Sequence, residues 1–421
     1  MPALTDRTVD ALIVGGGPAG STAATTLARA GRRVLVLEKE KFPRFHVGES
    51  LLPYNRRIFG ELGVWPKLAA AGFMQKRGAQ FLMGNGSHRV RLDFTKGSFN
   101  KYGEAFQVER AKFDHLLLTH ARESGAEVRE GCRVIEYRVG ADDVAVRFRD
   151  ENGSEQEVCA RFLVDASGLS NLTANRESLR EYYSGHKKVA IFGHFAHLDM
   201  PQGDEKGDIL IVRRENSWFW LIPLEDNKTS AGLVMDRADF QRLGKDVTTI
   251  FQAAVRDTSA VRDRFAKAEG LNAMNAVMDF SYRNRRLVDP RVVRIGDASG
   301  FIDPVFSSGV MLAMTSGQHG ARVVDAAISK GVAMTAEMHA YEKANRRRIS
   351  QYWEFIENFY QLPFAQVFFQ PDNRFGMVCA INTVLAGCTD LPFAAWWRLR
   401  LFFLLVRLNR RWPVVARIPV S

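Results

Sequence analysis

The stretch Asp10-Ala-Leu-Ile-Val14, followed at once by Gly15-Gly-Gly17-Pro-Ala19-Gly20, decides the fold. Its first five residues are mostly apolar and predict a buried strand, and the glycines that follow predict a turn into a helix over Ser21 to Arg29. Gly31 is suited to end that helix, and Val34 to Leu37 predicts a second strand. A strand, a helix and another strand in this order indicate a parallel α/β sheet.

The glycine spacing is that of a dinucleotide-binding turn. Gly15 permits the tight turn, Gly17 lets the backbone approach a pyrophosphate, and Gly20 lets the helix pack closely on the strand. Ala19 lies in the same turn and is included among the candidate cofactor contacts. Glu38 ends the second strand, 18 residues after Gly20, where a carboxylate accepts a hydrogen bond from an adenosine ribose.

Composition and charge narrow the class of protein. The 421 residues include 46% hydrophobic and 25% charged residues, which is globular composition and argues against disorder, collagen-like repeats and coiled coil. The formal net charge of +11 allows a nucleic acid, a membrane surface or an acidic partner. Four cysteines form no Cys-x-x-Cys or Cys/His cluster, so we expect neither a disulfide scaffold nor a metal site. No targeting segment or spanning run is visible, and we expect a cytoplasmic protein.

Two later turns are expected to meet the first one on the same cofactor. Asp165-Ala-Ser-Gly168 closes a predicted strand, and Gly296-Asp297 follows another, with Asp297 offering a carboxylate to ribityl or phosphate-side hydroxyls. A long helix predicted from about Ser308 to Ser329 would aim its N-terminal amides at the ligand. A single strand–helix–strand unit covers only half of an FAD, so these turns predict FAD, with Arg44, Ser50 and Arg110 as further candidate contacts.

We therefore predict an α/β fold with a Rossmann-like FAD-binding domain, an interleaved mixed-sheet substrate domain and a helical C-terminal region. The FAD-binding domain is expected at 1–80, 105–186 and 285–330, the substrate domain at 81–104 and 187–284, and the helical region at 331–421. Within the substrate domain, strands are predicted at 189–196, 209–212, 218–223 and 229–235, with a helical segment over 240–269.

Three stretches of this chain resemble one known family. They are Phe42-Pro-Arg-Phe-His46-Val-Gly-Glu49-Ser50, Trp218-Phe-Trp220-Leu-Ile222-Pro223 and Asp303-Pro-Val-Phe306-Ser-Ser308-Gly309. Together with the first glycine motif they resemble the flavin-dependent halogenases of the flavoprotein monooxygenase superfamily. The resemblance spans residues 8 to about 360, and the last sixty residues match only loosely.

The resemblance implies FADH2-dependent halogenation, most simply chlorination. In the family, reduced FAD reacts with oxygen to give a flavin hydroperoxide, which chloride attacks to form hypochlorous acid. The chloride amides would be those of Ser308 and Gly309 at the start of the late helix. The acid then reaches an active-site lysine, which either hydrogen-bonds it or becomes a chloramine. Lys76, five residues before Phe81, reproduces the spacing of the family lysine, and Arg77 beside it is the obvious decoy.

Trp218 and Trp220 are two residues apart on a strand, so both indoles face one side. In the family, this pair walls the flavin compartment against organic substrate. One departure concerns the turn before the late helix, where tryptophan halogenases carry a catalytic glutamate and this chain has Phe306. The departure favours a phenolic or pyrrolic substrate, whose own proton is lost on chlorination. If a base is required, Glu49, His194 and His197 are the candidates.

The partners that the resemblance implies are a small aromatic substrate, free or tethered to an acyl carrier protein, molecular oxygen and a separate flavin reductase. The C-terminal segment from Phe393 to Trp412 mixes aromatic residues with arginines, and no acid follows Asp390. A lid over the substrate cavity is the favoured interpretation, and a docking surface for an acidic carrier and a membrane-surface helix are the alternatives. No nucleic-acid module accompanies the charge.

Two other activities of the same superfamily share the FAD domain. An aromatic hydroxylase would take NAD(P)H directly and put oxygen on its substrate, and a prenyl-chain reductase would saturate double bonds. A third interpretation keeps the flavin fold only as a binding or scaffolding module. Lys76 and the two tryptophans argue against that third interpretation.

Overall fold

The glycine-rich stretch opens the first of two large sheets in the computed structural model, which describes residues 8–225, 227–244, 246–371 and 374–418. Strand β1 (Val9–Val14) lies between β2 (Val34–Leu37) and β10 (Glu155–Asp165), and all three are parallel. Helix α1 (Pro18–Arg29) connects β1 to β2. The predicted strand–helix–strand unit is therefore present, and its strands are buried because helices or further strands cover both faces.

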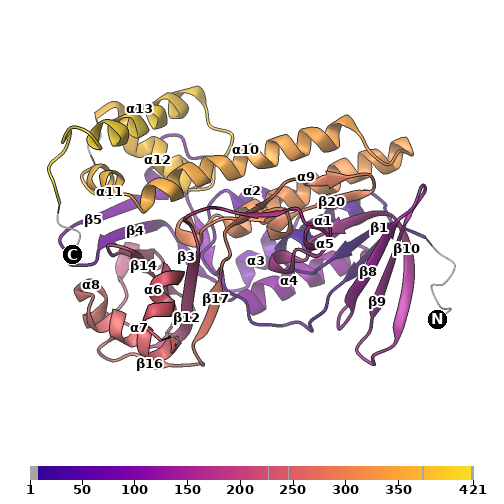
Figure 1. Cartoon of the computed structure of the whole chain (residues 1–421), viewed down its shortest axis with the longest axis horizontal. Helices are drawn as coiled ribbons and strands as arrows, with labels where there is room; N and C mark the ends of the chain where they lie inside the picture. Colours follow the sequence, from indigo (N-terminus) through magenta and orange to yellow (C-terminus); the bar gives the residue numbers. More distant parts are fainter. Residues whose placement is uncertain (1–7, 226, 245, 372–373, 419–421) are drawn as a thin grey trace.

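The rest of this sheet extends the parallel centre on both sides. Strand β7 (Glu127–Arg129) pairs with β2, and β20 (Val292–Arg294) pairs with β10. Helix α4 (Arg110–Glu123) precedes β7 and packs on α1. The remaining members are antiparallel: β8 (Arg133–Val139), β9 (Val144–Arg149) and β19 (Val288–Asp289). In Figure 1 the β8–β9–β10 ribbon projects at the right of the molecule.

The second large sheet is mostly antiparallel and carries the tryptophan pair. Its strands run in the order β16-β12-β15-β14-β13-β4-β5, with β17 also paired to β12. Their bounds are β4 Gly78–Met83, β5 Arg89–Asp93, β12 Lys188–Ala196, β13 Ile209–Arg213, β14 Ser217–Pro223, β15 Lys228–Asp236, β16 Glu269–Gly270 and β17 Asn275–Met278. The alternation along β14 sends Trp218, Trp220 and Ile222 to one face and Phe219 and Leu221 to the other.

Smaller elements join the two sheets. Helices α2 (Asn55–Glu61) and α3 (Trp65–Ala70) follow the loop after β2, and β3 (Met74–Lys76) pairs with β6 (Ala105–Gln107). Helix α5 spans Leu172–Arg176. A three-stranded sheet contains β11 (Arg180–Tyr182), β18 (Tyr282–Asn284) and β21 (Gly300–Phe301).

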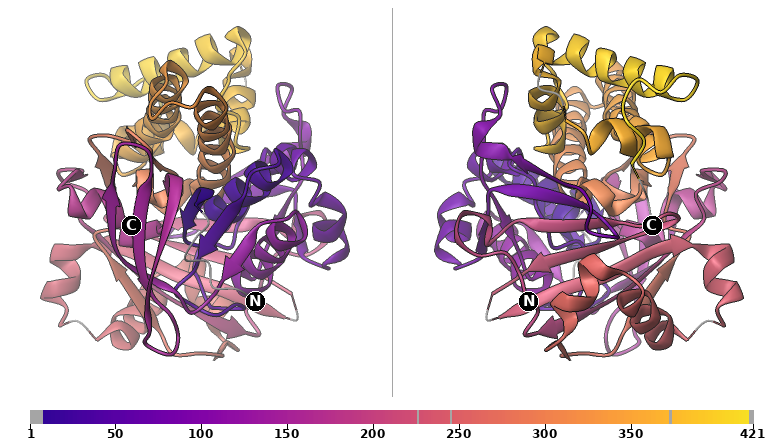
Figure 2. Two further views of the ribbon diagram at one scale, coloured as in Figure 1. Left: turned by 90° about the vertical axis from the view of Figure 1, so that its right-hand side faces the viewer. Right: turned by 90° about the vertical axis from the view of Figure 1, so that its left-hand side faces the viewer.

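Two long helices cross the molecule and bring both sheets together. Helix α9 (Gly309–Lys330) packs on α1, where Gly317 has no room for a Cβ atom because one would lie 2.5 Å from the carbonyl oxygen of Ala19. Helix α10 (Ala336–Phe359) packs on α9 and reaches the second sheet. Figures 1 and 2 show the two helices running side by side between the first sheet and the C-terminal helices.

The C-terminal region is helical, as the sequence predicts. It contains α11 (Leu362–Phe368), α12 (Met377–Leu385) and α13 (Phe393–Asn409), which pack together. Leu399, Phe402 and Phe403 of α13 join the hydrophobic core above β14, whereas Phe393 and Trp396 are exposed. Among the described residues, no helix is both long and apolar enough to cross a membrane.

Two local expectations differ from the structure. The helical segment predicted over 240–269 is broken into α6 (Arg237–Arg242), α7 (Val247–Arg256) and α8 (Ser259–Arg262). Gly244, with φ of +96°, lies in the first break, and an extended Thr258 begins α8. Strands β4 and β5 were not predicted, and β4 begins before residue 81, where the substrate domain was expected to start. The domain boundaries stay predictions.

Candidate active site

The first glycine turn forms a cradle at the carboxyl end of β1. Gly15 has φ of +104°, and a Cβ atom there would lie 2.4 Å from the carbonyl oxygen of Ala166. A Cβ on Gly20 would lie 1.9 Å from the carbonyl oxygen of Gly15. Gly17 caps the N-terminus of α1 with extended backbone, so the free amides of the first turn of α1 face the same space. Glycine is therefore required sterically at Gly15 and Gly20, and the turn exposes amides suited to an anionic group.

Acidic and basic side chains surround this cradle. The carboxylate of Glu38 accepts hydrogen bonds from the amides of Gly16 at 2.7 Å and Glu40 at 2.8 Å. Arg110, at the start of α4, forms a two-pronged ion pair with Asp114 at 2.7 and 2.8 Å, and Arg44 donates to the same carboxylate at 3.2 Å. Asp114 therefore orients both predicted arginines toward one place.

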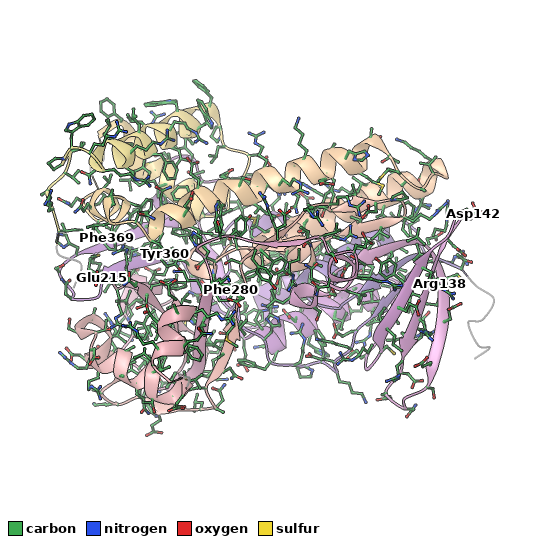
Figure 3. The ribbon with its side chains drawn as sticks, in the orientation of Figure 1. Arg138, Asp142, Glu215, Phe280, Tyr360 and Phe369 are labelled. Carbon is green, nitrogen blue, oxygen red and sulfur yellow. The ribbon has the colours of Figure 1, made fainter. Side chains whose placement is uncertain are left out.

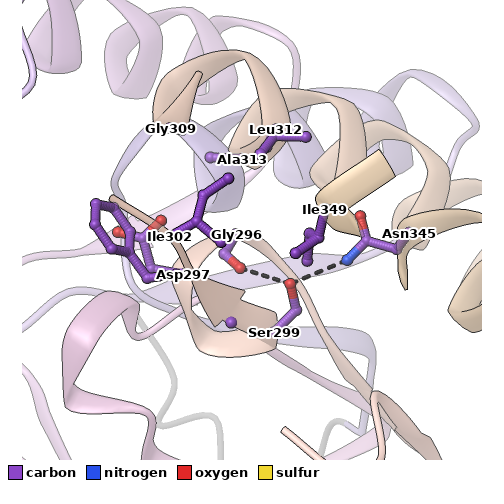
Figure 4. Close-up of a pocket in the computed structure, with 11 residues that line it drawn as sticks. Gly296, Asp297, Ser299, Ile302, Gly309, Leu312, Ala313, Asn345 and Ile349 are labelled. Carbon is purple, nitrogen blue, oxygen red and sulfur yellow. Dashed lines mark hydrogen bonds between the residues drawn. The ribbon is translucent and has the colours of Figure 1, made fainter. Parts of the chain in front are cut away.

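The other two predicted turns reach the same place. Asp297 lies in a short 3-10 turn after β20, and burial raises the pKa of its carboxyl to about 6, with Arg110 opposing the shift. A pocket of about 20 Å³ lies behind this turn, between the start of α9 and α10, where Ser299 donates to the carbonyl of Gly296 and accepts from Asn345 (Figure 4). Asp165 instead accepts from Ser167 and Thr173, so its carboxylate holds its own turn.

A large cavity of about 590 Å³ connects these turns with the second sheet. Eight of the predicted cofactor contacts line it, and so do both tryptophans and Gly309. The eight are Gly15, Gly17, Ala19, Glu38, Arg44, Ser50, Arg110 and Asp297. Gly20, Lys76 and Ser308 do not line it. Apolar side chains also line the cavity, and they include Phe192, Ile209 and Phe280, the last labelled in Figure 3.

Trp218 and Trp220 form a rigid wall of this cavity. Their ring centroids lie 5.9 Å apart, and both side chains are buried. Trp220 packs over Gly232 on the neighbouring strand, where a Cβ atom would lie 2.2 Å from the indole, and its Nε1 donates to Ser230 at 3.2 Å. The Trp220 indole is therefore held by close packing on β15 and by a hydrogen bond to the same strand.

Trp218 is held by a buried chain of hydrogen bonds that the sequence did not reveal. Its Nε1 donates to the hydroxyl of Tyr360 at 2.8 Å, and Tyr360 donates to Asp303 at 2.6 Å. Burial raises the pKa of Asp303 to about 6. Lys188 lies 3.8 Å from the centroid of the Tyr360 ring (labelled in Figure 3) and pairs with Asp236. Trp218, Tyr360 and Asp303 come from three distant segments, so only the fold could show this chain of contacts.

Lys76 is buried beside the cavity, behind Ser50. Its Nζ donates to the Oγ of Ser50 at 2.8 Å and to the carbonyl of Leu51 at 2.9 Å. The side chain is 1% exposed, and burial lowers the pKa of the amine to about 7, with Asp208 opposing the shift. Both acceptors are neutral, so no carboxylate holds the proton in direct contact. Arg77 is exposed and pairs with Glu104 on the surface.

The start of α9 presents free backbone amides beside the cavity. Ser308 is the N-cap of this 22-residue helix, and Gly309 is its first helical residue. The Ser308 hydroxyl is buried and has no hydrogen-bond partner among the described residues. An orphaned donor, free amides and the positive end of the helix dipole are suited to a small anion.

The three candidate bases have different positions. Glu49 lines the cavity, and one of its carboxylate oxygens lies 2.7 Å from Nε2 of His194, in a contact that buries both side chains. His197 is exposed and contacts Asn227, away from the cavity. Phe306 is buried among Phe81, Phe355 and Phe359. At position 306 the chain therefore has an apolar side chain in aromatic surroundings and no carboxylate.

The residues present fit an FAD. A Cβ atom would not fit at Gly15 or Gly20, and glycine there leaves the cradle at β1 open to a pyrophosphate. Glu38 directly follows the adjacent strand β2 and lines the same cavity. Asp297, the start of α9 and both tryptophans line the same cavity as the glycine turn, so the cavity is continuous from a nucleotide-binding turn to an aromatic wall. This combination defines an FAD-binding protein with an apolar compartment next to the cofactor.

Comparisons with known proteins agree with this class. Residues 8–355 match the model of the family described as FAD binding domain. The chain is 30% identical to a 1H-pyrrole-2-carbonyl-[peptidyl-carrier protein] chlorinase of Pseudomonas fluorescens, over 88% of each chain. It is 33% identical to a tryptophan 2-halogenase of Chondromyces crocatus, over 83% of this chain and 67% of that one.

Solved structures show the same likeness. The myxobacterial chondrochloren halogenase CndH superposes with a TM-score of 0.80 at 30% identity, covering 96% of this chain and 91% of the other. The flavin-dependent brominase Bmp2 superposes with a TM-score of 0.86 at 26% identity, covering 96% and 100%. The chain belongs to the flavin-dependent halogenases, which are FAD-dependent oxidoreductases. The predicted family, α/β fold class and FAD cofactor are thus confirmed.

Proposed function

We propose that this halogenase chlorinates an electron-rich phenol or pyrrole, free or tethered to a carrier protein, and that Lys76 delivers the chlorine. The observation that carries the proposal is the buried amine of Lys76, which is held by Ser50 of the cavity wall and contacts no carboxylate of the described part of the chain. An amine whose pKa is lowered to about 7 is partly neutral near pH 7, and a neutral amine has the lone pair that accepts chlorine.

When bound, reduced FAD would react with oxygen and so supply the oxidising equivalents that convert chloride into hypochlorous acid. The amides of Ser308 and Gly309 would hold the chloride, because they are free and lie at the positive end of α9. Trp218 and Trp220 would keep the organic substrate out of the flavin compartment, since both line the cavity and are held by close packing and by a hydrogen bond to Tyr360. The absence of a second dinucleotide motif in the sequence supports a separate flavin reductase as the source of FADH2.

The surroundings of Phe306 support a phenol or pyrrole as the substrate. A carboxylate cannot assist a ring at this position, because three phenylalanine rings surround the side chain. A phenol or pyrrole compensates by losing its own proton as the ring is chlorinated. The relative from Pseudomonas fluorescens, whose name gives a carrier-bound pyrrole, supports the same choice.

Halide dependence tests this function. The protein, reduced FAD and a panel of phenols, pyrroles and tryptophan would be assayed by product mass with chloride, with bromide and without halide. We expect a mass gain of one chlorine for a phenol or pyrrole, and no product without halide. An oxygenated product formed without halide would show a hydroxylase instead.

Lys76→Ala and Arg77→Ala form a matched pair for the role of the lysine. Both remove one cation from adjacent positions, but only Lys76 contacts the cavity wall. We expect Lys76→Ala to abolish chlorination while FAD binding and reoxidation continue, and Arg77→Ala to chlorinate normally. Chlorination by Lys76→Ala at the wild-type rate would disprove the assignment.

A further inference from the structure

Three arginines and a histidine gather outside the FAD cavity, where α2, α9 and α10 meet. Arg57 comes from α2, His319 and Arg322 from α9, and Arg348 from α10. Figure 1 shows the three helices next to one another, and α9 packs against each of the other two. None of the four residues lines the 590 Å³ cavity. The proposed chlorination does not use this cluster.

Arg348 is the centre of the cluster, and the described residues provide no hydrogen-bond acceptor for two of its nitrogens. The residue is 9% exposed, and its Nε and Nη1 atoms have no hydrogen-bond partner among the residues that the structure describes. Within the same described residues it forms no ion pair at or below 4.0 Å. Buried guanidinium groups are nearly always paired, because burying an isolated charge is costly. A buried cation with free donors is therefore suited to bind an anion that is not part of the chain.

The acids nearby do not neutralise the cluster. Glu61 is already engaged by Arg322 at 2.8 Å, by Gln318 at 2.9 Å and more distantly by Arg57. Asp390 is exposed. Its charge raises the pKa of Arg348, but burial has the larger effect and lowers that pKa. Burial, and then the charges of Arg348, Arg57 and Arg322, lower the pKa of His319 to about 4. His319 is therefore neutral near pH 7, and the three arginines leave a net positive charge.

The cluster adjoins the chain segment that holds Lys76. The carbonyl of Leu51 accepts from Lys76, and α2 begins at Asn55, four residues later. The side chain of Asn55 contacts the sulfur of Met314, which fixes α2 against α9 ahead of His319. The lysine contact at Leu51 and Arg57 of the cluster are thus linked by one short segment of chain.

We propose that Arg348, Arg57 and Arg322 bind a phosphate group, and that this phosphate is the phosphodiester of a carrier protein's phosphopantetheine arm. Guanidinium groups match phosphate in geometry and charge, and Arg322 and Arg57 are exposed enough to receive it from solvent. The arm has its phosphodiester at the carrier end and the acyl thioester at the other, so a phosphate held here leaves the acyl ring to extend toward Lys76. The assignment to the arm rests on the proposed function, and the phosphate site itself does not.

Binding of inorganic phosphate tests the site directly. Arg348→Met would be compared with the wild type and with Lys343→Met, which removes an exposed cation from the same helix. With FAD bound, so that the glycine cradle is filled, and at constant chloride and ionic strength, phosphate is expected to raise the melting temperature of the wild type and of Lys343→Met but not of Arg348→Met. By calorimetry, phosphate affinity should fall about tenfold or more in Arg348→Met.

The same variants guard against a folding artefact. Without phosphate, Arg348→Met should melt at or above the wild-type temperature, because it removes an unpaired buried charge. Arg322→Gln, at the exposed edge, should also weaken phosphate binding. An equal response to phosphate in the wild type, Arg348→Met and Lys343→Met, or no response in the wild type, would overturn the site.

Kinetics with two forms of one substrate identify the source of the phosphate. One form is the acyl group on a holo-carrier, and the other is the same acyl group on N-acetylcysteamine, which has no phosphate. If the arm is bound, Arg348→Met raises KM for the carrier form about tenfold and leaves kcat and the phosphate-free form unchanged. If Arg348→Met loses phosphate binding but its KM for the carrier form is unchanged, the site takes free phosphate only. That result would overturn the assignment to the phosphopantetheine arm. If no carrier form is chlorinated but the phosphate response is present, the carrier-bound substrate fails and the phosphate site stands.

Discussion

The indole nitrogen of Trp218 donates a 2.8 Å hydrogen bond to the hydroxyl of Tyr360, which lies 142 residues further along the chain. Tyr360 is the C-cap of α10 and donates in turn to the buried carboxylate of Asp303. The wall of the cavity is therefore fixed from two sides, by β14 and by the C-terminal half of the chain. A change in α10 can move a residue of the flavin compartment.

Asp303→Asn should stabilise the protein at high pH. Burial raises the pKa of Asp303 from 3.8 to about 6, so the folded protein binds the proton more tightly than the unfolded chain. The stability that this group contributes is lost as the pH rises from 4 through 6, and asparagine does not ionise. We expect the free energy of unfolding of Asp303→Asn, relative to wild type, to rise by about 3 kcal/mol between pH 4 and pH 8. Urea unfolding at both pH values measures it.

Asp263→Asn is the control, since Asp263 is exposed beside Arg262. Its difference from wild type should change little between the two pH values. A constant difference for Asp303→Asn would show that Asp303 ionises normally in the folded protein.

Gly232→Ala should displace the tryptophan wall. The added Cβ would lie 2.2 Å from the indole of Trp220, and the neighbouring strands leave that ring little room. We expect a loss of about 1–3 kcal/mol in the free energy of unfolding and a changed near-ultraviolet circular dichroism signal. Gly270→Ala, where nothing lies within 4 Å of the new atom, should leave both unchanged. Wild-type spectra for Gly232→Ala would contradict the packing.

Phe306→Glu should unfold the protein more readily without converting it into a tryptophan halogenase. The carboxylate would be buried among three phenylalanine rings. We expect a loss of about 3–5 kcal/mol in the free energy of unfolding, against about 1.5 kcal/mol or less for Phe306→Leu. Efficient chlorination of tryptophan by a well-folded Phe306→Glu protein would show that the site tolerates the charge.

Chlorination should rise with pH through the pKa of Lys76. Burial lowers that pKa to about 7, and the neutral amine, which accepts chlorine, becomes the major form above it. The single-turnover rate of chlorination should therefore increase between pH 6 and pH 8 and then level off. Because flavin chemistry also depends on pH, FAD reoxidation is followed in the same samples, and its rate should not show this increase between pH 6 and pH 8. A rate that falls with pH would favour the ammonium form as a hydrogen-bond donor.

The C-terminal helix corrects one sequence-based hypothesis. The arginine-rich segment was interpreted first as a lid over the substrate cavity, yet no residue of α13 lines the 590 Å³ cavity. Its aromatic residues are divided between the core and the surface, with Phe402 buried and Phe393 exposed. Hydropathy along a helix predicts that one side is buried, but not which part of the protein covers it.

The sequence by itself was enough to predict the family and the FAD cofactor, which are confirmed, whereas Lys76 and the Trp218–Trp220 pair stay predicted site residues. The role of Gly15 and Gly20 can be predicted from the sequence because a tight turn excludes Cβ atoms locally. The common orientation of Trp218 and Trp220 can be predicted because side chains on a strand repeat every two residues. Only the tertiary structure decided which side chains share a buried space. Glu49 meets His194 across 145 residues, Trp218 meets Tyr360, and Arg348 is left with no partner among the described residues. Such contacts depend on how separate elements pack, and desolvation, which sets the pKa of Lys76 and Asp303, exists only once they have packed.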